Sequence, residues 1–300
     1  MPLLTSETQA DILRACLHLP EEGREVGVEA LALFLHRPEE EIERGVEALA
    51  AAGHLEGACQ LTEAGRRQAL ALTRAHRLLE SYLQSRDGVP LEQIHRKADR
   101  LEHSISALEI ERIAEVLNHP RFDPHGDPIP TRSGVLPTIR RVPLPEWPGN
   151  REGRIAHIED EPVESCRELV ALGVSRGARI RILRPGVIWH HGRHLEVPES
   201  LWPLIGIEPL AEGERAASGG RALTEFAAGE AAEIIELDPA CTGAARHRML
   251  DIGLVPGTKV VPDFSAAFGG PRMYRVRGTC VALRREQTNG ILAKFWEEPA

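Results

Sequence analysis

The segment IHRKADRLEH, residues 94–103, combines two imidazoles and two carboxylates at helical spacing. On an α-helix, positions 95, 99, 102 and 103 fall within an arc of roughly 100°. An arc of that width normally faces a core, whereas imidazole and carboxylate are ligands of first-row divalent metal ions. The segment is therefore either a solvated helix face or part of a metal site.

A second pair of the same kind, His76 and Glu80, stands four residues apart in the preceding helical segment. A single pair of this spacing is usually a surface pair. Two sets on consecutive helices are how metal sites in helical bundles are commonly built. Mixed imidazole and carboxylate ligands suit Fe²⁺, Mn²⁺, Co²⁺, Ni²⁺ and Zn²⁺.

The elements that must position these residues follow a recognisable order. Apolar periodicity predicts helices over 6–19, 28–36 and 38–52, a short β segment over 54–62, and a long helix from 63 to 84. That order is typical of a winged helix-turn-helix. Two further helices are expected over 91–105 and 106–118, before the Pro- and Gly-rich HPRFDPHGDPIPTRSG.

The chain changes to β character after residue 150. Two copies of one pattern, LVALGVSRGARIRIL (169–183) and MLDIGLVPGTKVVPD (249–263), each carry a glycine four residues after another glycine. Alternating and β-branched runs surround both copies. We predict two tandem small β-barrels, joined by a linker over 212–220.

Composition restricts the classes of function. The 300 residues suggest two or three domains. The sequence contains no run of ~18 apolar residues, so it predicts no membrane span. Five scattered cysteines and the lack of a signal-like N-terminus favour a cytoplasmic protein. The net charge of −9 argues against a general polyanion binder. The sequence shows neither a nucleophile–base arrangement nor a nucleotide-binding glycine motif, so we expect no enzyme.

Residues 1–135 resemble the diphtheria-toxin-repressor family of iron- and manganese-responsive transcriptional regulators. The resemblance rests on LTEAGRRQALALTRAHRLLESYL, VPLEQIHRKADRLEHSIS and HPRFDPHGDPIP. Residues 150–211 resemble the SH3-like third domain of longer members, and residues 220–293 resemble the FeoA-type barrel associated with ferrous iron transport.

The resemblance implies an α+β multidomain fold. We expect a winged helix-turn-helix over 1–73, metal-binding and dimerisation helices over 74–140, an SH3-like barrel over 150–211 and a FeoA-like barrel over 220–296. It also implies a homodimer whose affinity for a double-stranded DNA operator depends on the bound metal.

The family's metal ligands transfer to matching positions of this chain. The ancillary site matches His76, Glu80 and His95, with Glu164 as a loosely aligned further ligand. The primary site matches Asp11, Asp99, Glu102 and His103. Asp99 stands where iron-type members have Cys and manganese-type members have Glu, so the set lacks sulfur and favours Fe²⁺ or Mn²⁺. A second carboxylate of manganese-type members is replaced by Arg14.

The expected recognition helix is acidic. Residues 1–73 hold 6 basic and 13 acidic side chains, and the segment RPEEEIERGVEAL carries five glutamates. Because DNA affinity depends on neutralising phosphates, we expect the contacts with DNA to be made by Arg37, Arg44, Arg66 and Arg67.

The alternative is a metal-sensing protein of the same fold that has lost operator binding. Such a protein would act in metal transport through protein partners, by way of its FeoA-like barrel.

One further polar segment, HHGRH (190–194), has the spacing of a loose metal site. It falls at an expected hairpin tip, so we predict a solvated polar loop.

Overall fold

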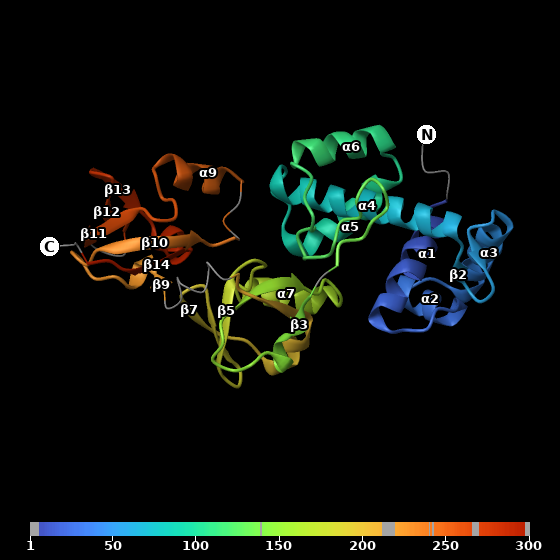
Figure 1. Cartoon of the computed structure of the whole chain (residues 1–300), viewed down its shortest axis with the longest axis horizontal. Helices are drawn as coiled ribbons and strands as arrows, with labels where there is room; N and C mark the ends of the chain where they lie inside the picture. Colours follow the sequence, from blue (N-terminus) through green and yellow to red (C-terminus); the bar gives the residue numbers. More distant parts are fainter. Residues whose placement is uncertain are drawn as a thin grey trace. The chain divides into compact units, whose positions relative to one another are not determined.

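The computed structural model divides into two compact units, residues 1–139 and 140–300 (Figure 1). It describes residues 6–138, 140–211, 220–239, 241, 243–265 and 270–297. Each unit is considered by itself. In the described part of the chain, the helices are too short or too polar to cross a membrane.

The head of the first unit is a winged helix-turn-helix. Its elements are α1 (Glu7–His18), η1 (Leu19–Glu22), α2 (Val28–Leu35), α3 (Glu39–Ala51), β1 (Leu55–Glu56) and β2 (Gln60–Leu61). Ser6 caps α1 in a capping box with Gln9, which satisfies otherwise unpaired amides. Gly45 lets α3 approach α1, because a Cβ there would lie 2.4 Å from Cδ1 of Ile12.

Three helices complete the first unit: α4 (Glu63–Ser85), α5 (Leu91–Glu102) and α6 (Ala107–Val116). Thr62 caps α4 and Ser106 caps α6. Aliphatic side chains of α4, α5 and α6 form one core, which includes Leu78, Ile94 and Ile110. The Pro- and Gly-rich segment is fastened to α4, since Arg74 and Arg77 donate to the carbonyl oxygens of Pro130 and Pro128.

The first barrel of the second unit is a six-stranded sheet of order β3-β8-β4-β5-β6-β7. Its elements are β3 (Val142–Pro143), η2 (Leu144–Glu146), β4 (Gly153–Ile158), α7 (Val163–Ala171), β5 (Arg179–Arg184), β6 (Val187–His190), β7 (Arg193–Glu196), η3 (Glu199–Leu204) and β8 (Ile205–Pro209). Its core is built from aliphatic side chains together with Trp147 and Trp202.

The second barrel is a six-stranded sheet of order β13-β12-β11-β10-β14-β9. Its elements are β9 (Arg221–Ala222), η4 (Leu223–Glu225), β10 (Ala232–Leu237), α9 (Gly243–Asp251), β11 (Lys259–Ser265), β12 (Arg272–Val276), β13 (Thr279–Leu283), α10 (Arg285–Asn289) and β14 (Ile291–Phe295). The predicted mixed fold, with two small β-domains at its C-terminal end, is confirmed.

The internal repeat has a backbone basis. Gly173 and Gly177 lie between α7 and β5, with φ of +85° and +82°. Gly253 and Gly257 lie between α9 and β11, with φ of +87° and +83°. A left-handed backbone favours glycine, so the four-residue glycine spacing marks one helix-to-strand turn used twice.

The structure of the segment HHGRH contradicts the expectation that it forms a solvated loop. His190 and His191 are both 0% exposed, because the second barrel covers this hairpin of the first. His191 Nδ1 lies 3.3 Å from Glu236 Oε1 of β10, and Gly192 accepts a backbone hydrogen bond from Ala222 of β9. The sequence located the hairpin but could not show that another barrel packs on it.

Candidate metal centre

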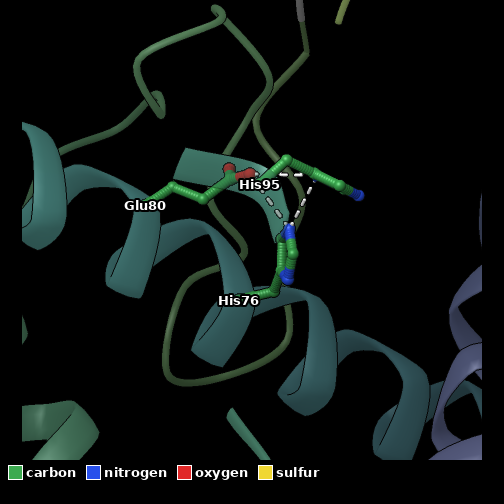
Figure 2. Close-up of side chains that lie close together, drawn as sticks. All are labelled: His76, Glu80 and His95. Atoms are coloured by element: carbon green, nitrogen blue, oxygen red, sulfur yellow. Dashed lines mark hydrogen bonds and ion pairs between the residues drawn. The ribbon is translucent and has the colours of Figure 1, made fainter. Parts of the chain in front are cut away.

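Two helices bring His76, Glu80 and His95 together. His76 and Glu80 lie one turn apart on α4, and His95 projects from α5, which packs along α4 (Figure 2). His76 Nε2 lies 3.0 Å from Glu80 Oε1 and 3.1 Å from His95 Nδ1. His95 Nδ1 lies 3.1 Å from the same Glu80 oxygen. We call these three residues the trio.

The trio has the geometry of one face of a metal coordination sphere. Neighbouring ligand atoms at right angles on bonds of about 2.1 Å lie about 3.0 Å apart, close to the three distances observed. Two imidazoles and a carboxylate on one face are ligands typical of Fe²⁺. His76 and Glu80 are buried and His95 is partly exposed, so the open side of the trio faces away from the core. The trio fits a divalent metal ion.

Glu102 of α5 fixes the ring of His76. His76 Nδ1 lies 2.6 Å from Glu102 Oε2, and because a carboxylate only accepts, Nδ1 is the donor. A carboxylate behind a ligating imidazole is a common support of metal ligands, since it orients the ring and raises its basicity. The arrangement leaves Nε2 of His76 directed at the other two members of the trio, Glu80 and His95.

The trio needs a positive charge at its centre, because Nε2, Oε1 and Nδ1 all carry lone pairs. Burial lowers the pKa of His76, but attraction to Glu80 and hydrogen bonds to Glu102 and Glu80 outweigh it and raise the pKa to about 10. Burial also acts to raise the pKa of Glu80, yet attraction to His76 and hydrogen bonds from both histidines hold it well below its usual range. In the metal-free protein a proton supplies the charge.

The second predicted set is organised around Arg14. This guanidinium donates from Nη2 to Asp11 Oδ1 at 3.0 Å and to Asp99 Oδ1 at 3.1 Å, and from Nη1 to Glu102 Oε2 at 3.3 Å. His103, directly after α5, has Nε2 at 3.7 Å from Glu102 Oε1. The guanidinium carries one positive charge against three carboxylates, so it balances the charge of this set only in part. Ligand atoms of Asp11, Glu102 and His103 lie within 4.8 Å of one another and could hold a metal ion. The assignment of Asp11, Asp99, Glu102 and His103 as ligands stays a prediction.

Glu164 lies on α7, in the second unit. Its assignment to the ancillary site also stays a prediction.

The arginines predicted to contact DNA are in different environments. Arg37 is half-buried, and donates to Asp11 Oδ2 at 3.2 Å and to Glu41 Oε1 at 2.7 Å. Arg44 and Arg66 are exposed, and Arg67 is exposed beside Glu63. DNA contact by any of the four stays a prediction.

Sequence reasoning missed the internal contacts of Arg14 and Arg37. One signal was available, because Arg14 stands three residues after Asp11 and therefore shares its helix face. The contact from Arg37 to Asp11 joins residues 26 positions apart, and a local pattern cannot show it.

The fold and the site together define a class of protein. It combines a winged-helix head, which is a DNA-binding fold, with helices that present two histidines and one carboxylate on one face as metal ligands. Residues 62–131 match the family described as iron dependent repressor, metal binding and dimerisation domain, and residues 221–294 match the FeoA domain.

Curated relatives match part of the chain. The iron-dependent repressor IdeR of Mycobacterium tuberculosis is 46% identical over 77 residues, which are 26% of this chain and 32% of that protein. The IdeR of Mycobacterium leprae is 34% identical over 142 residues, 43% of this chain and 60% of that protein. The matched part of the chain therefore spans less than two thirds of the length of these relatives.

A solved structure matches over nearly its whole length. It is described as a manganese-dependent transcriptional repressor complex with manganese, is 30% identical, and aligns with a TM-score of 0.61 over 67% of this chain and 99% of that chain. The chain thus belongs to the family of iron- and manganese-dependent transcriptional repressors.

Proposed function

We propose that this protein is a homodimeric transcriptional regulator whose affinity for an operator on double-stranded DNA is controlled by a divalent metal ion, Fe²⁺ or Mn²⁺. The observation that carries the proposal is the trio, whose three ligand atoms lie 3.0–3.1 Å apart. His76, Glu80 and His95 would hold the ion, and Glu102 would orient His76. The bound ion would supply a fixed double positive charge that joins α4 to α5.

The choice of metal follows from the donor atoms. The trio offers two nitrogens and one oxygen, without sulfur, which suits Fe²⁺ and Mn²⁺ better than softer ions. Co²⁺, Ni²⁺ and Zn²⁺ would also bind in vitro, since these ligands accept them.

The two other parts of the proposal rest on the head and on α6. A winged helix-turn-helix places its third helix in the major groove of DNA, and α3 holds that position in this head. On α6, Leu108 is 64% exposed and Val116 is 52% exposed, which supports a dimer contact along this helix. Acting on DNA would place the protein in the cytoplasm.

A gel-shift experiment tests the proposal. Wild type is compared with His95→Ala at about 100 mM salt, on DNA from upstream of its own gene, with and without Mn²⁺ under reducing conditions. We expect Mn²⁺ to tighten binding by about 5–150-fold, the usual range of coupling between two sites, and His95→Ala to abolish this effect. His194→Ala, an exposed histidine on β7, serves as the control.

The absence of a metal-dependent shift on any fragment would contradict DNA regulation. If the wild type then still binds Mn²⁺ and His95→Ala does not, the alternative holds: a metal-sensing protein without operator binding. The exposed Glu39 and Glu40 at the start of α3 would explain such a result, because they repel phosphates.

A further inference from the structure

We propose that the hairpin formed by β12 and β13 of the second barrel is an additional DNA-contacting surface, whose exposed arginines bind backbone phosphates of the duplex without reading its sequence. This inference rests on the proposed function, because it takes DNA as the partner of the protein. It names a source of the phosphate contacts that the acidic head lacks.

The head supplies little positive charge for binding DNA. Residues 1–73 hold 6 basic and 13 acidic side chains, and Arg37 is engaged by Asp11 and Glu41. A large share of the affinity of proteins for DNA comes from neutralising phosphates. A DNA-binding protein with such a head therefore needs basic side chains elsewhere in the chain.

The segment PRMYRVRGTCVALRR, residues 271–285, has the opposite charge. It carries five arginines and no acidic residue. A guanidinium presents a planar fork of donors that matches the oxygens of a phosphate group. Charges further apart than about 8 Å are largely screened at physiological salt, so the net charge of −9 of the whole chain does not cancel a local basic surface.

Backbone pairing places this segment at an edge of the barrel. β12 and β13 pair antiparallel through five residue pairs, and β13 is an end strand of its sheet. Side chains alternate between the two faces of a strand. Since Tyr274 and Val276 are buried, Arg275 between them points outward, and its side chain is 58% exposed.

Two of the five arginines are used within the barrel. Arg272 is half-buried and donates from Nη1 to the carbonyl oxygen of Phe226 at 2.7 Å. Arg277 turns back onto the barrel, with Nη2 at 3.5 Å from Thr258 Oγ1. Both side chains therefore support the fold of the barrel.

The other three, Arg275, Arg284 and Arg285, are exposed, and we call them the contact arginines. Asp263 Oδ2 lies 3.5 Å from Arg275 Nη2, with the two side chains 41% and 58% exposed, and Glu286 follows Arg285 in the chain. Such an exposed ion pair contributes little to stability. A phosphate can therefore take the place of the carboxylate beside Arg275.

The shape of the hairpin suits a contact with duplex DNA. Val276 pairs with Thr279, so that the turn consists of Arg277 and Gly278 alone, with φ of +48° and +81°. A two-residue turn with both φ angles positive follows the twist of its strands and keeps the hairpin compact. Two-stranded β-ribbons are of a size that the major groove admits.

An anionic membrane surface is the less favoured partner. Cys280, which pairs with Arg275 across the hairpin, and Ala282 are the exposed residues of β13 beside the contact arginines. Both are small, whereas surfaces that enter a bilayer carry large apolar or aromatic side chains. Phe264 of β11 is 66% exposed, so vesicles are included in the test.

The salt dependence of DNA binding tests the inference. Fluorescence anisotropy compares full-length wild type with Arg275→Gln/Arg284→Gln on DNA from upstream of its own gene and on a duplex of scrambled sequence. Each is measured with and without Mn²⁺, between about 50 and 200 mM salt.

Each phosphate contact contributes about 0.9 to the slope of log affinity against log salt concentration, so the double variant should have a slope smaller by about 1.8. Over this range of salt, wild type should lose about tenfold more affinity than the double variant. The effect should be equal on both DNAs, because phosphate contacts carry no sequence information.

Two further variants complete the experiment. Arg167→Gln/Arg184→Gln is the matched control: it removes the same charge at two exposed positions of the first barrel and should keep the slope of wild type. Arg275→Gln alone should lower the slope by about 0.9, which keeps the inference testable if the double variant does not fold. Binding to vesicles that contain phosphatidylserine is measured for wild type and the double variant.

Slopes equal to that of wild type in both Arg275 variants overturn the inference, and so does an equal loss of slope in the control. Vesicle binding that the double variant loses, with DNA binding unchanged, overturns it in favour of a membrane surface. In each of these cases, tightening by Mn²⁺ leaves metal-controlled DNA binding standing. A smaller slope without any effect of Mn²⁺ supports the DNA-contacting hairpin and contradicts metal control, and a wild type that binds neither DNA contradicts both proposals.

Discussion

At the scale of single residues, the chemistry of the site depends on which atoms share a charge. Glu102 accepts from His76 and from Arg14, so it supports the trio rather than lying within it. Asp99 likewise pairs with Arg14, and attraction to His76, His95 and Arg14 lowers its pKa against the opposing effect of burial. We therefore expect residues that resemble ligands by type and spacing to divide into ligands and supports according to their contacts.

Glu102→Gln tests that division. We expect Mn²⁺ affinity to fall by about 10–100-fold, the usual effect of removing a support behind a ligating histidine, while the number of ions bound stays at one per chain. Titration calorimetry together with metal analysis measures both quantities. Two ions in wild type and one in Glu102→Gln would show instead that Glu102 is a ligand of a second ion.

At the scale of elements, close packing of the head fixes how α3 and α4 are held. Gly65 lies in the first turn of α4, where a Cβ would stand 1.9 Å from the carbonyl oxygen of His54. That oxygen also accepts the backbone N–H of Thr62, so the wing and α4 meet without room for a side chain.

Gly65→Ala should therefore destabilise the protein by about 3 kcal/mol, at the upper end of the usual effect of overpacking, because backbone must move to relieve the clash. Thermal or urea unfolding measures it. Gly27→Ala is the control, since its added Cβ meets nothing within 4 Å. Equal stability of the two variants would contradict the packing argument.

We expect the dimer contact to involve α6. Leu108→Glu places a charge on the most exposed apolar position of this helix, and burying an unpaired carboxylate in an interface is strongly unfavourable. We expect a shift from dimer to monomer in light scattering after size-exclusion chromatography. Leu33→Glu, on the similarly exposed leucine of α2, should leave the dimer intact, and a dimer unaffected by Leu108→Glu would place the contact elsewhere.

At the scale of the whole molecule, a charged interface joins the two barrels of the second unit. Glu236 of β10 accepts from Arg154 and Arg179 of the first barrel, each at 3.2 Å. Asp238 accepts from Ser175 Oγ at 3.1 Å. Burial acts to raise the pKa of Glu236, but a hydrogen bond from His191 and attraction to Arg154 lower it to about 2, so Glu236 keeps its charge down to strongly acidic pH.

His190 makes the same unit sensitive to milder acid. Burial lowers its pKa to about 4, against attraction to Asp238, whereas in an unfolded chain it would be about 6.5. The unfolded state therefore binds the proton first, so stability is complete above pH 6.5 and is lost as the pH falls toward 4. We expect a loss of about 2 kcal/mol at pH 5.

Unfolding of wild type and His190→Gln between pH 4 and 8 measures this effect. Gln can still accept from Ser175 but does not titrate in this range, so the variant should lack the loss between pH 7 and 5. His194→Gln, at an exposed position, should keep it. An unchanged pH profile in His190→Gln would exclude His190 as the cause.

The sequence by itself determined the local order of this protein. Apolar periodicity and the caps Ser6, Thr62 and Ser106 specify the helices, and the repeated glycine spacing specifies two related barrels, because both signals act within a few residues. Helical geometry likewise assigned His76 with Glu80, and His95 with Asp99, to shared faces. These are short-range consequences of backbone geometry.

Only the tertiary structure decided what those faces meet. It placed His95 of α5 against the α4 pair, directed Arg14 into three carboxylates, turned Arg37 toward Asp11, and buried His190 beneath the second barrel. Apart from the contact of Arg14 with Asp11, these contacts join residues far apart in the chain. They follow from packing between elements, which single-residue types and spacings do not encode.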